Sequence, residues 1–222
     1  MSTIKFGLFG AGGFGREVIP YVKASVCKTL GAHEAEVEVF FVETWMPDRQ
    51  EVNGYPLISI DEFLGLEGAR YFNVAIGDGR AREQIDRQVG TRAEMLSLRA
   101  EQSIFMDRNV IGEGAIFCPN TMVTSNATIG RSFHANIYSY VAHDCVIGDY
   151  VTFAPGVRCN GRVEIGDHAY IGTNAIIKEG RPDKPLRIGA GAVIGMGAVV
   201  TKDVPDGVTV IGNPARLMDR KS

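Results

Sequence analysis

The residues best suited to acid–base chemistry in this 222-residue chain are the neighbours His143 and Asp144. The Asp144 carboxylate can hold one ring nitrogen of the histidine and so fix the tautomer whose other nitrogen takes a proton. Eighteen residues further on stands Gly161, which a repeat of that length places directly above His143. A glycine there leaves an unobstructed space and an exposed backbone N–H that can support an oxyanion. A base beside such a donor predicts acyl transfer.

An insertion rich in basic residues follows two repeat lengths after His143. It runs from Gly180 to Arg187, so it rises above the histidine on the same edge. We expect the cations in and beside this insertion to bind the phosphates of a phosphorylated acyl carrier. Together with the N–H of Gly161, the predicted carrier-binding residues are Lys178, Arg181, Lys184, Arg187 and Lys202.

A glycine-rich turn near the start of the chain is the second candidate site. It follows an apolar, extended segment, Ile4–Phe9, and its Gly10-x-Gly12-x-x-Gly15 spacing puts backbone N–H groups and a helix N-terminus where phosphate oxygens can bind. The same spacing also suits a tight strand-to-helix turn that binds nothing. About 100 residues precede the repeat, which is half of a dinucleotide-binding architecture, so a nucleotide-linked sugar fits better than NAD. The predicted contacts are Gly10, Gly12, Gly13, Phe14 and Gly15.

Polar side chains follow two further predicted strands, at the sheet edge where ligands bind. Glu43 ends the strand Val37–Val42, and its carboxylate can pair with the two adjacent donors of a guanine edge, or it can be an ordinary solvated residue. Asp78 follows the strand Tyr71–Ile76, where it either contacts the ligand or caps the next helix. Arg82, in the first turn of that helix, is predicted to contact the substrate.

Zinc chemistry is the main alternative for a histidine site of this kind. The chain has four histidines, and their spacings place no close pair on a single rung of the repeat. We therefore expect no metal site and no metal cofactor. The histidines are His33, His134, His143 and His168.

Composition excludes other classes of function. The net charge of −3 and the scattered Lys and Arg residues indicate no nucleic-acid partner. No apolar run approaches the roughly 18 residues that span a membrane, and the first residues do not read as a signal peptide. The four cysteines have no CxxC spacing, so we expect free thiols in a reducing cytoplasm.

A hexapeptide repeat positions the His143 site. Ile-Gly recurs at 111–112, 129–130, 147–148 and 165–166, a spacing of 18, and returns at 188–189 after five inserted residues. All twelve positions six apart from Ile111 to Ile177 are apolar. This spacing suits short extended segments joined by sharp corners, with three segments in each triangular coil. The apolar side chains then point into the coil. Residues 101–222 are thus predicted to form an all-β parallel β-helix with a C-terminal cap, the alternatives being a right-handed β-helix or a repetitive sandwich.

Residues 1–100 are predicted to form a separate α/β domain that binds the nucleotide sugar. Strand and helix patterns alternate there, with a helix from Arg16 to about Leu30 between the first two strands. Alternation of this kind indicates a parallel βαβ sheet that is half-Rossmann-like.

The whole chain resembles the left-handed β-helix sugar acyltransferases that carry an N-terminal nucleotide-sugar domain. These include UDP-4-amino-sugar N-acetyltransferases and sialic acid O-acetyltransferases. The segments that carry the resemblance are Phe9–Gly13, Val74–Asp78 and Gly212–Ala215, and the stretches 133–145 and 147–156 are most similar to GDP-perosamine N-acetyltransferases.

The resemblance implies roles for individual residues. His143 would be the general base, Asp144 its orienting acid, and Gly161 the donor to the thioester carbonyl of acetyl-CoA. Asn136 would lie near the sugar amine. Thr152 stands where some UDP-sugar relatives have a histidine that contacts the sugar, so the substrate pocket differs from theirs.

The resemblance also implies the assembly and the reaction. The β-helix would wind left-handed, although parallel crossovers are normally right-handed. The protein would be a cytoplasmic homotrimer with acetyl-CoA bound between neighbouring prisms. It would acetylate the 4-amino group of a GDP-linked 4-amino-4,6-dideoxy sugar for bacterial surface polysaccharide, the O-antigen of lipopolysaccharide. Alternatives are O-acetylation of a hydroxyl, a UDP-linked acceptor, or a sensor that binds the nucleotide sugar without turnover.

Overall fold

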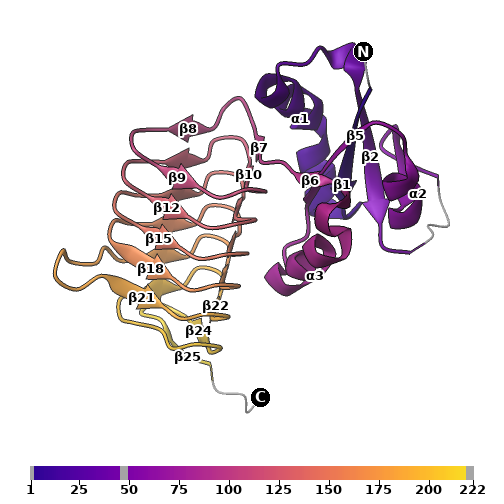
Figure 1. Cartoon of the computed structure of the whole chain (residues 1–222). Helices are drawn as coiled ribbons and strands as arrows, with labels where there is room; N and C mark the ends of the chain where they lie inside the picture. Colours follow the sequence, from indigo (N-terminus) through magenta and orange to yellow (C-terminus); the bar gives the residue numbers. More distant parts are fainter. Residues whose placement is uncertain (1–2, 46–49, 219–222) are drawn as a thin grey trace. The chain divides into compact units, whose positions relative to one another are not determined.

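The computed structural model describes residues 3–45 and 50–218. The chain divides into two compact units (Figure 1). One unit comprises Met1–Gly77 and Ala81–Ala100, and the other comprises Asp78–Arg80 and Glu101–Ser222. The first is an α/β unit and the second is built of short stacked strands.

The α/β unit is built on a sheet with strand order β3-β4-β2-β1-β5-β6. β1 lies in the middle because its side chains are apolar and buried from Phe6 to Phe9. All pairings in this sheet are parallel except that of β3 with β4. The strands are β1 (Ile4–Phe9), β2 (Val37–Glu43), β3 (Glu51–Val52), β4 (Tyr55–Ser59), β5 (Ala69–Val74) and β6 (Glu94–Met95); the helices are α1 (Gly13–Leu30), α2 (Ile60–Gly65) and α3 (Gly79–Val89), with short 3₁₀ turns at Glu34–Glu36 and Gly90–Arg92.

The elements in this unit differ from the predictions in several places. α1 begins at Gly13 rather than at residue 16, because Gly12 already acts as its N-cap. β5 ends at Val74, two residues early: Ala75 N–H still donates to Phe9 O, but Gly10 then turns the neighbouring chain away at φ +96°. The segment with β3, β4 and α2 was not predicted as structured, and its strands extend the sheet beyond β2.

The second unit is a parallel β-helix with three flat faces (Figure 1). One face runs β23-β20-β17-β14-β11-β8, the next β21-β18-β15-β12-β9, and the third β24-β22-β19-β16-β13-β10, with β25 antiparallel to β24. The strands of this unit are β8 (Ile104–Phe105), β9 (Val110–Ile111), β10 (Ile116–Phe117), β11 (Met122–Val123), β12 (Thr128–Ile129), β13 (His134–Ala135), β14 (Tyr140–Val141), β15 (Val146–Ile147), β16 (Thr152–Phe153), β17 (Arg158–Cys159), β18 (Val163–Ile165), β19 (Tyr170–Ile171), β20 (Ile176–Ile177), β21 (Leu186–Ile188), β22 (Val193–Ile194), β23 (Val199–Val200), β24 (Thr209–Ile211) and β25 (Arg216–Leu217). The short strand β7 (Leu98–Arg99) precedes them at the end of the first unit.

The predicted rungs fill the interior of this prism. Of the twelve apolar positions that recur every six residues, eleven are buried, and the first, Ile111, is partly buried against the same cluster. Phe117, Phe133 and Phe153 stack along the axis, with ring centroids 5.9 and 5.0 Å apart. One apolar side chain per strand therefore makes a continuous core.

Each corner of the prism holds one residue in the left-handed conformation. From Arg108 to Asn174, every sixth residue has φ between 53° and 72°. Ten of these twelve positions are not glycine, so the turn is imposed by the coil and its ladder hydrogen bonds rather than by residue preference. Side chains next to a corner consequently stack in columns with a period of 18.

Ile147 and Val146 on β15 provide a test of the rung pattern, because one points inward and the other outward. Ile147 is 2% exposed and Val146 is 49% exposed. Ile147→Ala should lower the free energy of unfolding by about 2–5 kcal/mol, since it leaves a cavity. Val146→Ala should change it by less than about 0.5 kcal/mol. Denaturant titration of both variants measures the difference, and equal losses would contradict the assigned register.

Candidate active site

His143 lies on the corner between β14 and β15, and its ring faces outward. The side chain is 42% exposed, and Nδ1 is 2.8 Å from Oδ2 of Asp144. Asp144 occupies the left-handed corner position, with φ 58°. The predicted contact of His143 with the neighbouring carboxylate is present, on the outside of the prism.

The Asp144 carboxylate is held in its ionised form. Its pKa lies below the ordinary value of 3.8, chiefly because of the hydrogen bond with His143; partial burial opposes this, and the charges of His143 and Arg162 and a hydrogen bond from Asn126 add to the lowering. An ionised carboxylate only accepts hydrogen bonds, so Nδ1 of His143 carries the hydrogen. In the neutral form of the ring, Nε2 then has a lone pair, as a general base requires.

Gly161 stacks on His143 as predicted, but the space above its Cα is not open. A Cβ built on Gly161 would lie 2.5 to 2.9 Å from three ring atoms of His143. The imidazole itself fills the space that the missing side chain leaves, which corrects the expectation of an unobstructed gap. Among residues 3–45 and 50–218, no acceptor takes the Gly161 N–H, but Gly161 is buried, so the expectation of an exposed N–H is also corrected.

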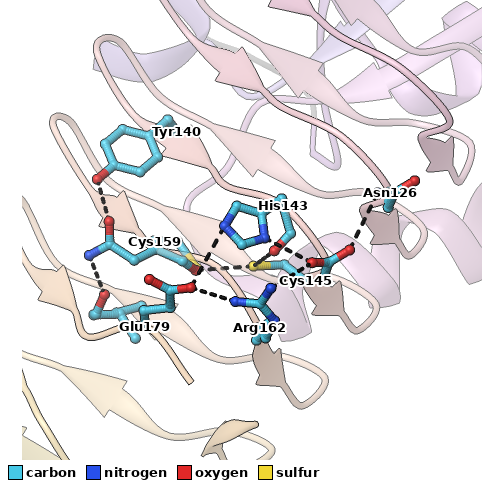
Figure 2. Close-up of polar contacts among 10 residues, drawn as sticks. Asn126, Tyr140, His143, Cys145, Cys159, Arg162 and Glu179 are labelled. Carbon is cyan, nitrogen blue, oxygen red and sulfur yellow. Dashed lines mark hydrogen bonds and ion pairs between the residues drawn. The ribbon is translucent and has the colours of Figure 1, made fainter. Parts of the chain in front are cut away.

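Two charged residues that the sequence analysis missed complete the cluster around His143 (Figure 2). Arg162 stacks one coil above Asp144, and Glu179 stacks two coils above His143. Arg162 Nη1 is 2.5 Å from Glu179 Oε1, and its Nη2 is 3.7 Å from Asp144 Oδ2. Glu179 Oε1 in turn lies 3.7 Å from Nε2 of His143. The 18-residue period identifies both positions, since 162 and 179 follow 144 and 143 by one and two coils.

The peptide that precedes Gly161 is fixed by three hydrogen bonds. Tyr140 Oη donates to Asn160 Oδ1 over 2.9 Å, Asn160 Nδ2 donates to Ile177 O over 2.8 Å, and Cys145 Sγ donates to Asn160 O over 3.2 Å. Burial raises the pKa of the Tyr140 hydroxyl, which therefore remains a donor at neutral pH. The Gly161 N–H is thus carried on a rigid segment.

Four of the five predicted carrier-binding cations line one groove of about 570 Å³. Glu179 lines the same groove and also lies near His143, so the groove extends to the histidine. Arg187 does not belong to this groove: its Nε pairs with Glu164 Oε2 at 2.9 Å, and it lines a separate groove of about 520 Å³. The four residues of the first groove are Lys178, Arg181, Lys184 and Lys202.

In the α/β unit, the glycines of the predicted phosphate-binding turn differ in what requires them. A Cβ on Gly15 would lie 1.9 Å from Gly10 O, so this glycine is demanded by chain packing alone. Gly12 and Gly13 have nothing within 4 Å of a built Cβ, and Gly12 caps α1 without a side-chain hydrogen bond. Open space over a helix N-terminus whose N–H groups receive no side-chain hydrogen bond suits a phosphate. Phe14 is half-buried beside it.

Three polar residues predicted to contact the substrate have partners within the chain. Glu43 Oε1 accepts the N–H of Ala11, so this carboxylate stabilises the glycine-rich turn. Asp78 Oδ1 accepts the N–H of Arg80 at 2.8 Å, which is the helix-cap alternative. Arg82 is fully buried, and its Nη1 donates to the carbonyls of residues 76 and 77. These contacts indicate that Asp78 and Arg82 stabilise the loops rather than contact the substrate directly.

Asn136 and Thr152 are not brought to His143 within one chain. Both belong to the face of β13 and β16, whereas His143 lies on the corner between the two other faces. Asn136 Oδ1 accepts the N–H of Ile137 at 2.8 Å, and Thr152 is buried, in register with His134 on the next strand. Neither residue therefore belongs to the His143 cluster within one chain.

The described residues contain no cluster of three or more His, Cys, Asp or Glu side chains arranged to hold a metal ion. None of the helices in the described part is long and apolar enough to span a membrane. The described cysteines carry free thiols, and Cys145 and Cys159 lie inside the prism.

Comparison with known proteins agrees with this architecture. Residues 126–161 match the family "Bacterial transferase hexapeptide (six repeats)". GDP-perosamine N-acetyltransferase from Escherichia coli O157:H7 is 49% identical over 97% of this chain and 96% of that protein. The structure of WeeI from Acinetobacter baumannii AYE is 47% identical, with a TM-score of 0.90 over 97% of this chain and 100% of that one. PerB from Caulobacter crescentus, solved with CoA and GDP-perosamine, is 25% identical, with a TM-score of 0.78 over 96% and 97%.

The fold and the histidine corner define a transferase of the hexapeptide-repeat class, so the prism is a left-handed β-helix. Within that class, the chain belongs to the family of sugar N-acetyltransferases that contains the GDP-perosamine N-acetyltransferase of Escherichia coli O157:H7.

The contact between Gly161 and the His143 ring leads to a prediction that needs no activity assay. Gly161→Ala should push the ring away from Asp144, because its Cβ would approach the ring to 2.5 Å. Loss of that hydrogen bond should raise the pKa of Asp144 toward its ordinary value of 3.8. Carboxyl ¹³C NMR titration measures this, with circular dichroism as the check on folding. An unchanged Asp144 pKa in the folded variant would show that the ring does not depend on the glycine.

Proposed function

We propose that this chain transfers the acetyl group of acetyl-CoA to the 4-amino group of a GDP-linked 4-amino-4,6-dideoxy sugar such as GDP-perosamine. The observation that supports this most directly is His143, with Nδ1 on Asp144 and its ring packed on Gly161, whose N–H has no acceptor among the described residues. The relative from Escherichia coli, which is named for this reaction, matches nearly the whole chain.

The chemistry follows from the arrangement of these groups. The acceptor amine attacks the thioester carbonyl, and Nε2 of His143 removes a proton from the attacking nitrogen. The Gly161 N–H stabilises the oxyanion of the tetrahedral intermediate, a contribution of about 2.7–4 kcal/mol for one such donor. The C–S bond then breaks, and the proton held by His143 passes to the departing thiolate. The products are the N-acetylated sugar and CoA thiol.

The groove beside the histidine supports acetyl-CoA as the acyl donor. Lys178, Arg181, Lys184 and Lys202 surround it, and phosphates bind such clustered cations. Glu179 lies where this groove meets His143, so a thioester near the base and phosphates among the cations can belong to one extended ligand. Arg187, on the neighbouring groove, is not included in this proposal.

The α/β unit is proposed to bind the nucleotide diphosphate. Gly12 and Gly13 offer the open turn at the N-terminus of α1. Glu43 uses one oxygen for the turn, so it retains a second oxygen for a base edge. The choice of GDP over UDP is supported by the Escherichia coli relative and by PerB, which contains GDP-perosamine.

A homotrimer in the cytoplasm is proposed as the working form. Asn136 and Thr152 lie away from His143 in one chain, so an arrangement in which neighbouring prisms share a site would bring substrate-binding and catalytic residues together. The acetylated sugar would then serve bacterial surface polysaccharide synthesis.

Removing the base should lower turnover while the fold remains. His143→Ala should reduce kcat by about 10² to 10⁴, the usual contribution of general base catalysis. Asp144→Asn should cost less, since this carboxylate orients the ring. Release of CoA thiol with GDP-perosamine as acceptor measures both effects. An unchanged kcat in His143→Ala would remove the base assignment.

Removing cations from the groove should weaken binding of the acyl donor only. The double variant Lys178→Ala, Lys202→Ala should raise the KM for acetyl-CoA roughly tenfold, equivalent to about 1.4 kcal/mol. The KM for the sugar should stay unchanged, and the effect should shrink at high salt. Arg131→Ala, which removes a cation paired with Glu113 at another corner, is the matched control. Equal effects of the two changes would exclude a specific phosphate site.

A further inference from the structure

Two hydrogen-bond acceptors, one on His143 and one on Glu179, face each other with a small gap between them (Figure 2). Nε2 of His143 and Oε1 of Glu179 are 3.7 Å apart, which is too long for a hydrogen bond between them. In the neutral imidazole that acts as the base, the ring hydrogen is on Nδ1, toward Asp144, and Nε2 has a lone pair. A carboxylate has no hydrogen to donate. Any group bound between these atoms must therefore donate to both of them.

The gap exists because Gly161 stands between the two residues in the column. His143, Gly161 and Glu179 follow one another at intervals of one coil. Since Gly161 has no side chain, the imidazole and the carboxylate approach each other from the coils below and above. The N–H of Gly161, for which no described residue is an acceptor, belongs to the same column, so the proposed oxyanion donor and the two acceptors share one edge of the prism.

Arg162 fixes the Glu179 carboxylate in this position. Its Nη1 is 2.5 Å from Oε1 of Glu179, and its Nη2 is directed toward Asp144. The guanidinium only donates, so it holds both carboxylates and leaves the lone pair of the imidazole untouched. Arg162 is 30% exposed and Glu179 is 50% exposed, so the carboxylate remains accessible to a ligand.

We propose that Glu179 selects an amine rather than a hydroxyl as the acyl acceptor. An amine nitrogen about 2.9 Å from each acceptor fits a separation of this size. It donates one N–H to His143 and a second to Glu179. A hydroxyl has a single hydrogen, so one of the two acceptors would remain unpaired, and sites of this kind reject analogues that lack a donor. The inference rests on the proposed function, which supplies His143 as the base.

The two hydrogens then have different fates, and the proton balance closes. The hydrogen on the His143 side leaves the nitrogen when the C–N bond forms, and it passes to the thiolate when the C–S bond breaks. The hydrogen on the Glu179 side stays on the nitrogen and becomes the N–H of the amide product. Glu179 thus binds the acceptor through a hydrogen that is not transferred.

Glu179→Gln tests the proposal, because glutamine keeps the size of the side chain but lacks the charge and has donors of its own. The two acceptors compared are GDP-perosamine and the GDP-linked 6-deoxyhexose that carries a 4-hydroxyl in place of the amine. Calorimetry in the presence of CoA gives the Kd of each sugar, and CoA thiol release gives kcat/KM. We expect the preference for the amine to fall at least about tenfold. The KM for acetyl-CoA should not rise, because the change removes a negative charge from the basic groove.

Glu113→Gln is the matched control. Glu113 also pairs with an arginine one coil above it, Arg131, but at another corner of the prism. This change should leave both sugars and acetyl-CoA unaffected. Glu179→Asp keeps the charge on a shorter side chain and should restore part of the preference.

The possible outcomes separate this inference from the proposed function. Undiminished preference for the amine in a folded, active Glu179→Gln enzyme overturns the inference and leaves the acetyltransferase assignment intact. Equal weakening of both sugars and of acetyl-CoA also overturns it, since it indicates a structural role for the Arg162–Glu179 pair. A wild-type protein that binds the sugars but transfers no acetyl group overturns the proposed function instead.

Discussion

The ladder of backbone hydrogen bonds between successive coils is the constraint on which the site depends. Each coil of 18 residues donates to the next, as when Arg162 N–H binds His143 O and Gly180 N–H binds Gly161 O. The ladder requires a left-handed corner every six residues, even where the residue is Asp144 or Arg162. Residues that are 18 apart in sequence are thereby neighbours in space, without any further packing to bring them together.

A column of stacked side chains would normally be crowded, and the active corner avoids this by alternating residue types. In one column the side-chain amide of Asn126 donates to Asp144, and Asp144 in turn lies near the oppositely charged Arg162, so each residue contacts the next favourably. In the adjacent column a glycine separates an imidazole from a carboxylate. The result is a cluster of one base, two carboxylates and one guanidinium with a small gap, held by short-range contacts on a rigid edge. The cluster is preorganised because its backbone belongs to the ladder.

The repeat made much of this predictable from the sequence. The period placed Gly161 over His143 and all twelve rungs inside, because a period of 18 converts directly into stacking. It did not reveal that the ring would occupy the space over Gly161, since rotamers depend on neighbours such as Arg162. The α/β unit has no sequence repeat from which spatial neighbours could be predicted. Arg82 resembled a ligand contact by its position but is buried on loop carbonyls, and Glu43 binds the turn beside it.

The position of Glu179 explains why the insertion begins where it does. Glu179 and Gly180 are the last residues in register before the chain leaves the repeat, and a Cβ on Gly180 would lie 2.1 Å from Arg162 O. Glu179 faces the base across 3.7 Å and lines the basic groove. If the insertion began one coil earlier, no carboxylate would face the imidazole; if it began one coil later, the cations would be carried away from the histidine. The break in the repeat therefore couples the groove for the acyl carrier to the acid–base corner through one side chain.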